Sequence, residues 1–573
     1  MTTGPAAEPG RAQAAPIAAD HFLRALARHG VDYFFVNPGT DFPPIVEAYA
    51  RARRANHAVP EPVLVPHENL AVAMAHGVYL MTGRAQAVMV HVNVGTANTL
   101  NNIANVARDR APVIVAAGRT PITEKGHFGS RNRPIHWAQE MFDQAGMVRE
   151  LVKWDYELRM PDQVGDVVAR AWEVAMTAPR GPVYLVLPRE PLAAPVADAD
   201  VAAPRALPAA AQPDPQAIAT LAGWIADADN PLLIVGNVGN AAGAETLARL
   251  AGRFALAVVS QGARTLVLPS GHPMLCGFDS AAELPHTDLA IVVDCDAPYY
   301  PSLTSPAPRC RFAHIGEDPA FQRYPMRSFP TDLSITAHPA HALAALESVL
   351  AGREDALHAR VAARRSRIAE RVAARNAQIL AESQPAGERI TPQYLSRAIG
   401  EVLGDEAVIF NEYSLMPAHC PRTRYGTFFA PSAAGGLGWG LGAALGAKLA
   451  APEKLVVATL GDGVYLFSNP TVAHWIGGRY RLPVLTVIFN NQRYGAVRRA
   501  TLSMFKDGLA GEDDGRFLAD LDPSPPYDEL MRAQGGFGER VERASELPAA
   551  LARARDAVVR DKRQALLNVI TPY

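Results

Sequence analysis

The chain has little cysteine and no excess of charge. Its four cysteines are far apart among 573 residues and form no C-x-x-C pair, which argues against a disulfide framework and suits a reducing compartment. The formal net charge of −2 gives no electrostatic reason to expect nucleic acid or an anionic membrane as a partner. No apolar run approaches the roughly 18 residues that a spanning helix needs. We therefore expect a cytoplasmic protein that binds small molecules.

At 573 residues the chain is longer than one hydrophobic core can serve, so several domains are expected. Short runs of apolar and β-branched residues alternate with longer helical patterns, which is typical of parallel sheets with crossover helices. These runs are VDYFFVNPG, EPVLVPHE, AQAVMVHV, PVIVAAGR, PVYLVLP, PLLIVGN, ALAVVSQ, LAIVVD, RFAHIGE, AVIFNE, KLVVATLGDG, PVLTVIFNN and ALLNVITP. The sequence predicts three tandem doubly wound α/β domains with mainly parallel sheets.

Composition sets the domain boundaries. The first 17 residues are rich in Ala, Pro and Gly, a Pro- and Ala-rich stretch without periodicity begins at Pro195, and a long Arg-rich helical pattern precedes Ile390. We predict a disordered tail over 1–17, α/β domains over 18–195, 213–351 and 390–573, a linker over 196–212 and a linker helix over 352–389.

A carboxylate between two glycines ends one of the strands of the third domain. Gly461 and Gly463 let the backbone approach a ligand, and the N–H groups that open the next helix favour phosphate. Asp462 would repel a phosphate unless a cation lay between them, and Mg²⁺ or Ca²⁺ fits this role best.

A second polar turn follows at the end of the next strand. Asn490 and Asn491 carry amide oxygens, which are neutral ligands for a hard cation. The residues between Gly463 and Asn490 suffice for helix plus strand, which would return the chain to the same edge of the sheet. Together the two turns predict a site for a metal-bound diphosphate.

The paired turns, GDG and then NN after 26 residues, resemble the cofactor signature of the thiamine diphosphate enzymes, in the branch that holds pyruvate decarboxylase, acetolactate synthase and benzoylformate decarboxylase. The resemblance implies a pyrimidine-binding domain, a middle Rossmann-like domain and a diphosphate-binding domain, in this order. It implies that Asp462, the Asn491 side chain and the Arg493 carbonyl hold Mg²⁺. The cofactor contacts that it implies are Glu68, Ser414, Gly435, Leu437, Asp462, Gly463, Val464, Asn491, Tyr494 and Gly495.

The same family uses an activating glutamate, and Glu68 matches it just after a strand and at the start of a helical pattern. A carboxylic acid beside the aminopyrimidine ring promotes removal of the thiazolium C2 proton. A glutamate in a first turn also complements the helix dipole by itself. With the other motifs present, we assign Glu68 to catalysis, Gly435 to a backbone contact with the pyrimidine amine, and Leu437 to supporting the bent cofactor.

The resemblance implies decarboxylation of a 2-oxo acid through ylide and enamine intermediates, with carboligation as a side activity. Thr40 follows an NPG sequence like that of benzoylformate decarboxylase, where a serine meets the substrate carboxylate, and His91 matches a catalytic histidine. We expect a bulky or aromatic, benzoylformate-like substrate. The alternatives are an acetolactate synthase-like carboligase and an acyl-CoA lyase or decarboxylase.

Three departures from benzoylformate decarboxylase stand out. The middle domain lacks the second active-site histidine, for which Tyr299 or Tyr300 is a candidate replacement, Val464 replaces a serine, and Tyr413 enters a hydroxyl-rich loop. The segment after the Asn pair, with Met504 and Phe505, is either a lid or a surface excursion. We expect no flavin, and a homodimer or homotetramer whose sites are shared between subunits.

Overall fold

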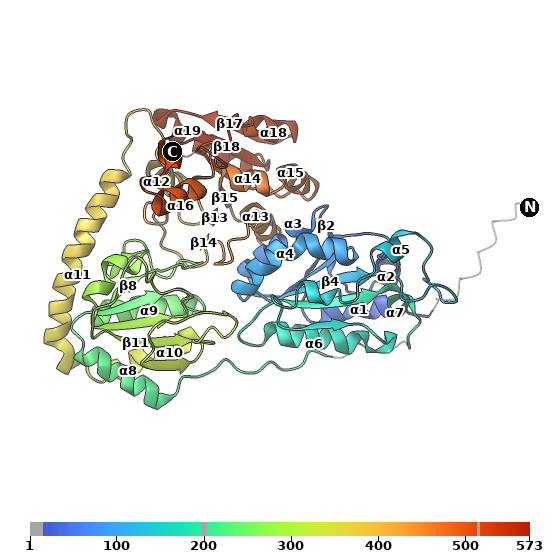
Figure 1. Ribbon diagram of the computed structural model, residues 1–573, viewed down its shortest axis with the longest axis horizontal. Helices are drawn as coiled ribbons and strands as arrows, with labels where there is room; N and C mark the ends of the chain where they lie inside the picture. The colour runs from blue at the N-terminus through green and yellow to red at the C-terminus, as the bar shows by residue number, and fades with distance from the viewer. Residues whose placement is uncertain (1–14, 198–200, 202, 513–515, 573) are drawn as a thin grey trace, which may run out of the picture.

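The computed structural model describes residues 15–197, 201, 203–512 and 516–572 and arranges them as three α/β units (Figure 1). The predicted disordered tail lies almost wholly outside the described residues, as does part of the predicted linker. Each unit holds one sheet of six parallel strands, so the predicted fold class is confirmed.

The strands of the first sheet are β1 Tyr33–Asn37, β2 Glu61–Leu64, β3 Gln86–Val90, β4 Val113–Arg119, β5 Asp155–Glu157 and β6 Val183–Pro188. Those of the second are β7 Pro231–Val235, β8 Ala257–Val259, β9 Leu275–Gly277, β10 Leu289–Val293, β11 Arg311–Gly316 and β12 Leu333–Thr336. Those of the third are β13 Val408–Glu412, β14 Phe428–Phe429, β15 Val456–Gly461, β16 Leu485–Asn490, β17 Phe537–Val541 and β18 Ala565–Ile570.

The first and third sheets share one topology. Their orders are β2-β1-β3-β4-β6-β5 and β14-β13-β15-β16-β18-β17, which are the same when the strands of each unit are counted from its start. The middle sheet has the order β12-β11-β10-β7-β8-β9, which is the Rossmann order read from its far edge. The first and third units are therefore two copies of one architecture around a different middle unit.

The helices of the first unit are α1 Ala18–Arg28, α2 Pro43–Ala55, α3 Glu68–Thr82, α4 Val92–Arg108, α5 Ile135–Ala138, α6 Val164–Met176 and α7 Arg189–Ala193. Those of the middle unit are α8 Pro215–Asp227, α9 Ala241–Phe254 and α10 Pro339–Ala351, followed by α11 Glu354–Glu382. Those of the third are α12 Pro392–Leu403, α13 Gly440–Ala450, α14 Asp462–Phe467, α15 Pro470–Arg479, α16 Gly495–Met504, α17 Leu509–Glu512, α18 Tyr527–Ala533 and α19 Leu547–Val559.

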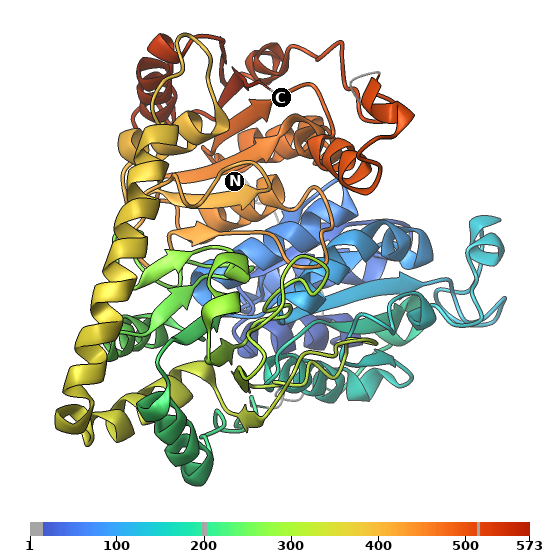
Figure 2. The same ribbon diagram turned by 60° about the vertical axis from the view of Figure 1, so that its left-hand side comes forward.

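The helix α11 forms one edge of the molecule and connects the middle unit to the third (Figures 1 and 2). It contributes Leu357, Ile368 and Val372 to the core of the middle unit, whereas most of its other residues are exposed. Its arginines are therefore largely the solvated face of a connecting helix.

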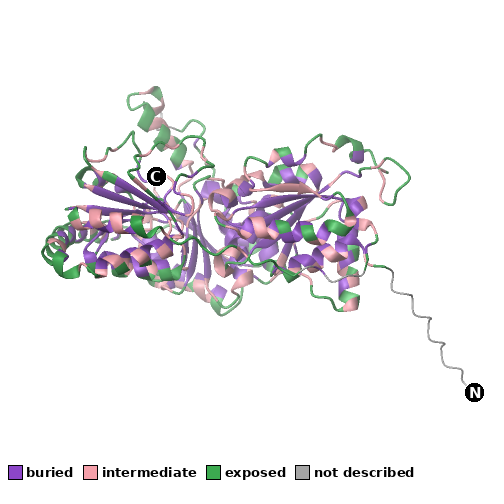
Figure 3. Cartoon of the chain, turned by 90° about the horizontal axis from the view of Figure 1, so that it is seen from below, coloured by how far each residue is buried: buried purple, intermediate pink, exposed green. Residues whose placement is uncertain are grey.

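Apolar strands lie in the interior of each unit, with helices around them (Figure 3). β3 and β16 are buried at every position, as expected for parallel strands that are covered on both faces. Within the described ranges, we find no helix with both the length and the apolar character needed to cross a membrane.

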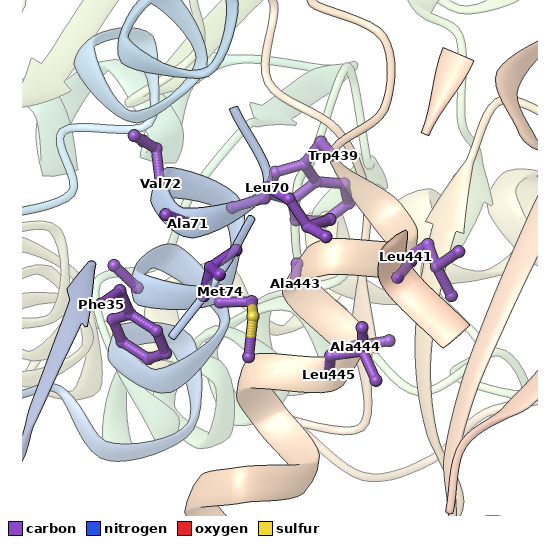
Figure 4. Packing of buried hydrophobic residues seen from close by; sticks show 14 of the residues in the cluster. Phe35, Leu70, Ala71, Val72, Met74, Trp439, Leu441, Ala443, Ala444 and Leu445 are labelled. Carbon is purple, nitrogen blue, oxygen red and sulfur yellow. The ribbon is translucent and has the colours of Figure 1, made fainter. Parts of the chain in front are cut away.

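One hydrophobic core is shared by the first and third units and centres on α3 and α13 (Figure 4), while each unit has a further core on the other face of its sheet. Glu68 opens α3, where a carboxylate complements the helix dipole, and Gly83 ends it in a left-handed conformation. The two helices touch through backbone: a Cβ at Gly446 would lie 2.0 Å from the Met74 carbonyl oxygen, and one at Gly77 2.0 Å from that of Ala443. Only glycine permits this approach.

Buried polar groups fasten the middle unit to this core. Arg264 Nε lies 2.9 Å from Asp109 Oδ1, and His76 Nε2 lies 3.4 Å from Asp109 Oδ2. Trp439 Nε1 donates to His76 Nδ1 over 2.9 Å, so one network joins all three units. Burial lowers the pKa of His76 to about 3 and raises that of Asp109 to about 7.

We predict that Gly446→Ala destabilises the protein by about 1–3 kcal/mol or more, because the added methyl group must push α13 away from α3. Gly478→Ala is the matched control, since Gly478 also lies in a helix but has open space around it, and there a gain of about 0.5–1 kcal/mol is expected. Thermal unfolding of both variants checks this. An unchanged midpoint for Gly446→Ala would contradict the close packing.

Candidate functional site

The predicted site residues of the third unit meet at the carboxyl edge of its sheet. β15 lies between β13 and β16, with Glu412 paired to Leu460 and Gly461 paired to Phe489. The loops that follow these three strands therefore begin side by side. β13 and β15 are also where the strand order reverses, which is where ligands bind in open α/β sheets.

Asp462 is the first residue of α14 and is 2 % exposed. Its Oδ1 accepts from the Gly463 N–H over 2.9 Å, whereas its Oδ2 has no hydrogen-bond partner among the described residues. Burial raises the pKa of Asp462 to about 6, against the opposing effect of backbone N–H groups of Gly463, Gln492 and Arg493. A buried carboxylate oxygen without a donor is costly unless a cation pairs with it.

The two asparagines have different surroundings. Asn490 is fully buried, and its amide donates to Ser524 Oγ over 2.8 Å and to Asn568 Oδ1 over 2.9 Å, so it holds the end of β16 in place. Asn491 is only partly buried, and its Oδ1 accepts from the Arg493 N–H over 3.0 Å. Asn491 thus remains the better candidate for a ligand.

The backbone of the glycine turn is in close contact with its neighbours. A Cβ at Gly463 would lie 2.5 Å from the Tyr494 ring, and one at Gly461 would lie 3.2 Å from Ser414 Oγ. Ser414 and Tyr494 therefore stand on either side of the GDG turn. Val464 is buried in the shared core, and Gly495 begins α16.

A buried acid holds the loop before α13 in place. Glu412 accepts from the Gly438 N–H over 2.9 Å and from the Gly440 N–H over 2.6 Å, and burial raises its pKa to about 7. Gly435 has φ +67°, and a Cβ there would lie 3.0 Å from the Tyr413 hydroxyl. Tyr413 itself has φ 69° and is 58 % exposed. A positive φ is rare for an aromatic residue and is typical of functional sites.

A stripe of asparagines on α4 connects the first unit to this loop. Asn105 donates to the Gly436 carbonyl over 2.8 Å and accepts from the Gly436 N–H over 3.0 Å, and Asn101 donates to the Leu437 carbonyl over 2.7 Å. One turn earlier, Asn98 donates to Glu68 Oε2 over 2.5 Å. The structure therefore brings Glu68, which is partly exposed, to the same side of α4 as the loop with Gly435 and Leu437.

The predicted substrate residues lie in one polar cavity of the first unit. Thr40 and His91 both line it, and His91 Nδ1 donates to Asp41 Oδ1 over 2.6 Å. The pKa of His91 is raised, chiefly by the hydrogen bond to Asp41, against desolvation, with smaller contributions from the charges of Asp41 and Glu68.

The candidate residues of the middle unit and of the segment after the Asn pair differ in exposure. Tyr299 is 6 % exposed and packs against Phe312 and Phe329 in the core of the middle unit, whereas Tyr300 is 47 % exposed and is the more accessible of the two candidates for the role of the missing histidine. At the end of α16, Met504 and Phe505 are exposed, 77 % and 59 %. Residues 513–515 of that segment lie outside the described residues.

Sequence reasoning missed Asp41, Gln139 and the α4 asparagines. Asn98, Asn101 and Asn105 recur at intervals of three and four residues in a helix that is otherwise largely apolar, which was a readable signal. Gln139 Nε2 lies 3.4 Å from His91 Nε2, yet it comes from a distant segment, and no local pattern indicates that contact.

The chain matches two family models. They are "Thiamine pyrophosphate enzyme, N-terminal TPP binding domain" over residues 17–147 and "Thiamine pyrophosphate enzyme, C-terminal TPP binding domain" over residues 412–569. Between them they cover half of the chain and all of the predicted cofactor, metal and substrate residues of the first and third units.

Two curated relatives and one solved structure extend the likeness beyond these domains. Benzoylformate decarboxylase of Pseudomonas aeruginosa is 28 % identical over 82 % of this chain and 85 % of its own. A probable acetolactate synthase large subunit of Methanocaldococcus jannaschii is 23 % identical over 97 % and 92 %. The thiamine diphosphate-dependent 4-hydroxybenzoylformate decarboxylase of Rhodococcus jostii RHA1 has the same fold, with a TM-score of 0.76, 22 % identity and coverage of 97 % and 99 %.

Proposed function

The chain belongs to the thiamine pyrophosphate enzymes, and we propose that within this family it decarboxylates a 2-oxo acid without oxidation, with carboligation as a side activity. The observation that carries the proposal is the buried Asp462 Oδ2, which lacks a partner among the described residues at the sheet edge where a diphosphate would bind.

The residues present fit thiamine diphosphate with Mg²⁺ or Ca²⁺. Asp462 Oδ2, the Asn491 amide oxygen and the Arg493 carbonyl are hard oxygen donors, and a cation held by few protein groups takes its remaining ligands from phosphate. Further contacts to the cofactor would come from Ser414, Gly435, Leu437, Gly463, Val464, Tyr494 and Gly495. When bound, the cofactor supplies the electron sink for loss of carbon dioxide.

Glu68 would act on the cofactor from the first unit. Its carboxyl group is held by Asn98 and remains partly exposed, so a ring nitrogen is able to reach it. A carboxylic acid placed there would be able to hold a proton for the aminopyrimidine ring. Leu437, whose carbonyl accepts from Asn101 and whose side chain packs against the shared core, would support the bent cofactor.

We predict that Asp462→Asn weakens Mg²⁺-dependent binding of thiamine diphosphate by at least about tenfold, because a neutral amide replaces the one carboxylate ligand. Asp561→Asn is the control: Asp561 follows α19 in the same unit, is exposed, and forms a surface ion pair with Arg560 away from the glycine turn. Equilibrium titration of cofactor with and without Mg²⁺ checks both. Equal affinity in Asp462→Asn and the wild type would remove Asp462 from the metal site.

A bulky or aromatic 2-oxo acid is the substrate class that we propose. The likeness to benzoylformate decarboxylase supports it, as do the exposed apolar residues Met504 and Phe505 at the end of α16. Thr40 and His91 would meet the substrate carboxylate and its reacting carbon. The acetolactate synthase relative, which spans nearly the whole chain, supports the alternative of a carboligase.

The substrate proposal predicts release of carbon dioxide and an aldehyde from benzoylformate-like acids when thiamine diphosphate and Mg²⁺ are present. A panel of 2-oxo acids, assayed by coupled aldehyde detection, checks this. Acetoin after acid treatment, with pyruvate as the only substrate consumed, would favour the acetolactate synthase-like alternative. Turnover of acyl-CoA compounds alone would favour the lyase alternative. No aldehyde from any acid would contradict the decarboxylase.

We also propose a homodimer or homotetramer, in the cytoplasm, with sites shared between subunits. Phe128, Trp137 and Phe142 are exposed, 85 %, 47 % and 111 %, on one segment of the first unit, and a second copy of the chain would cover them. The four cysteines, all among the described residues, are free, which fits a reducing compartment. Sedimentation of the purified protein reports the number of chains.

A further inference from the structure

His91 and Asp41 form a pair that the sequence motifs do not assign. His91 is the residue before α4, and Asp41 lies in the loop between β1 and α2 and is 3 % exposed. The 2.6 Å contact joins His91 Nδ1 to Asp41 Oδ1. A carboxylate only accepts hydrogen bonds, so the proton of the pair resides on Nδ1.

Two glycines make room for this pair. A Cβ at Gly39 would lie 2.1 Å from His91 Nδ1, and a Cβ at Gly118 would lie 1.8 Å from Asp41 Oδ2. Neither glycine has a positive φ, so space rather than backbone conformation requires glycine at both positions. The backbone at Gly39 thus packs against the imidazole, and the backbone at Gly118 packs against the carboxylate.

The same carboxylate also holds a strained backbone. Val92 has φ 35°, which is a genuine outlier for a β-branched residue. Its N–H donates to Asp41 Oδ2 over 3.3 Å, so the two oxygens of Asp41 engage the side chain of His91 and the backbone just after it. Strain of this kind persists where the surroundings over-determine a conformation, and it gathers at functional sites.

The pair leaves the other ring nitrogen of His91 facing the cavity. Nε2 lies 3.4 Å from Gln139 Nε2, and the cavity that His91 lines also holds Thr40. With Nδ1 protonated, Nε2 carries the lone pair of the neutral imidazole, and in the imidazolium it carries a proton that it can donate. The proton that His91 exchanges therefore enters and leaves on the cavity side.

We propose that Asp41 is a positioning residue for His91: it keeps the Nδ1 proton in place and stabilises the imidazolium, so that Nε2 delivers the proton of the decarboxylation. This inference rests on the proposed function. Loss of carbon dioxide leaves an electron pair on the former carbonyl carbon of the substrate. The Nε2 proton replaces the lost carboxyl group there, and water then returns a proton to Nε2.

Other charged groups surround the pair. Glu68 on α3 adds a negative charge, while Arg119 on β4, His136 on α5 and Arg189 on α7 line the cavity. Arg119 is neutralised by ion pairs with Glu140 and Glu157, and Arg189 donates to the carbonyls of Gly129 and Ser130. The pKa of His136 is lowered by burial and then by Arg189, so it is mostly neutral near pH 7.

The first test measures the ring of His91 directly. Long-range ¹H–¹⁵N spectra of the full chain should show a neutral form protonated on Nδ1 and a pKa above the ordinary value of about 6.5. In Asp41→Asn the pKa should fall by at least about 1, because the amide carries no charge. Asp143→Asn, an exposed carboxylate paired with Arg149, is the control and should change nothing.

A second variant disturbs the pair without touching the carboxylate. Gly39→Ala places a methyl group against the imidazole and should also lower the pKa of His91, whereas Gly271→Ala, which has open space, should not. Intact amide spectra show that each variant is folded. If Asp41→Asn fails to fold, Gly39→Ala still decides the question.

The second test is the pH profile of kcat/KM for an accepted 2-oxo acid. His91 is charged below its pKa, so activity should fall as the pH rises through that value, and Asp41→Asn should move this alkaline limb to lower pH by the same amount as the NMR titration. If the pKa of His91 is the same as in the wild type in both Asp41→Asn and Gly39→Ala, Asp41 does not position His91. If the pKa of His91 falls but the alkaline limb of kcat/KM does not move, His91 does not deliver the proton of the reaction. If no 2-oxo acid is turned over, the proposed function fails, and the NMR titration still decides the pair.

Discussion

The backbone contact between α3 and α13 is the constraint on which the site depends. Glu68 stands at the start of α3, and the loop with Gly435 and Leu437 leads into α13. Glycines at 77, 442 and 446 let the two helices approach closely, so the two ends of these helices are held in a fixed relation. A larger residue on this contact would shift the first unit against the third and so disturb the positions from which the chain presents the proposed activating acid and the proposed diphosphate edge.

Buried polar groups make the second contribution to the site. Glu412, Asp462 and Asp109 are acids whose pKa is raised by burial, to about 7, about 6 and about 7. Glu412 is satisfied by two backbone N–H groups of the loop before α13, and Asp109 has Arg264, whereas Asp462 keeps one oxygen without a described partner. Glu412 and Asp109 thus stabilise the structure around the site, whereas Asp462 has an oxygen available for a ligand.

Much of the fold was readable from the sequence because its strands are short, fully apolar and ended by turn residues. All thirteen strand patterns quoted from the sequence correspond to strands of the three sheets. The strands that were not predicted lie at sheet edges: β5, β9, β12, β14 and β17. β14 has two residues and β5 and β9 three each, too few to show alternation, and β17 reads FGERV, with a glycine and two charged residues.

The candidate site was readable where a motif is local and hidden where contacts are long-range. Asp462 and Asn491 follow neighbouring strands, so their proximity could be inferred from spacing. Asp41 and Gln139 reach His91 from loops that are separated from it by about fifty residues, and only the fold brings them together. The sequence could not tell Tyr299 from Tyr300, because an aromatic residue near a strand end is as suited to the core, where Tyr299 packs, as to a site.

The measurement that tests the account most directly is hydrogen–deuterium exchange at C2 of bound thiamine diphosphate, followed by NMR in Glu68→Gln. The account predicts that this variant still binds the cofactor with Mg²⁺ and that exchange slows by orders of magnitude, whereas Glu61→Gln, an exposed glutamate of β2, exchanges like the wild type. Exchange at the wild-type rate in Glu68→Gln would show that the carboxylate carried by α3 does not act on the cofactor.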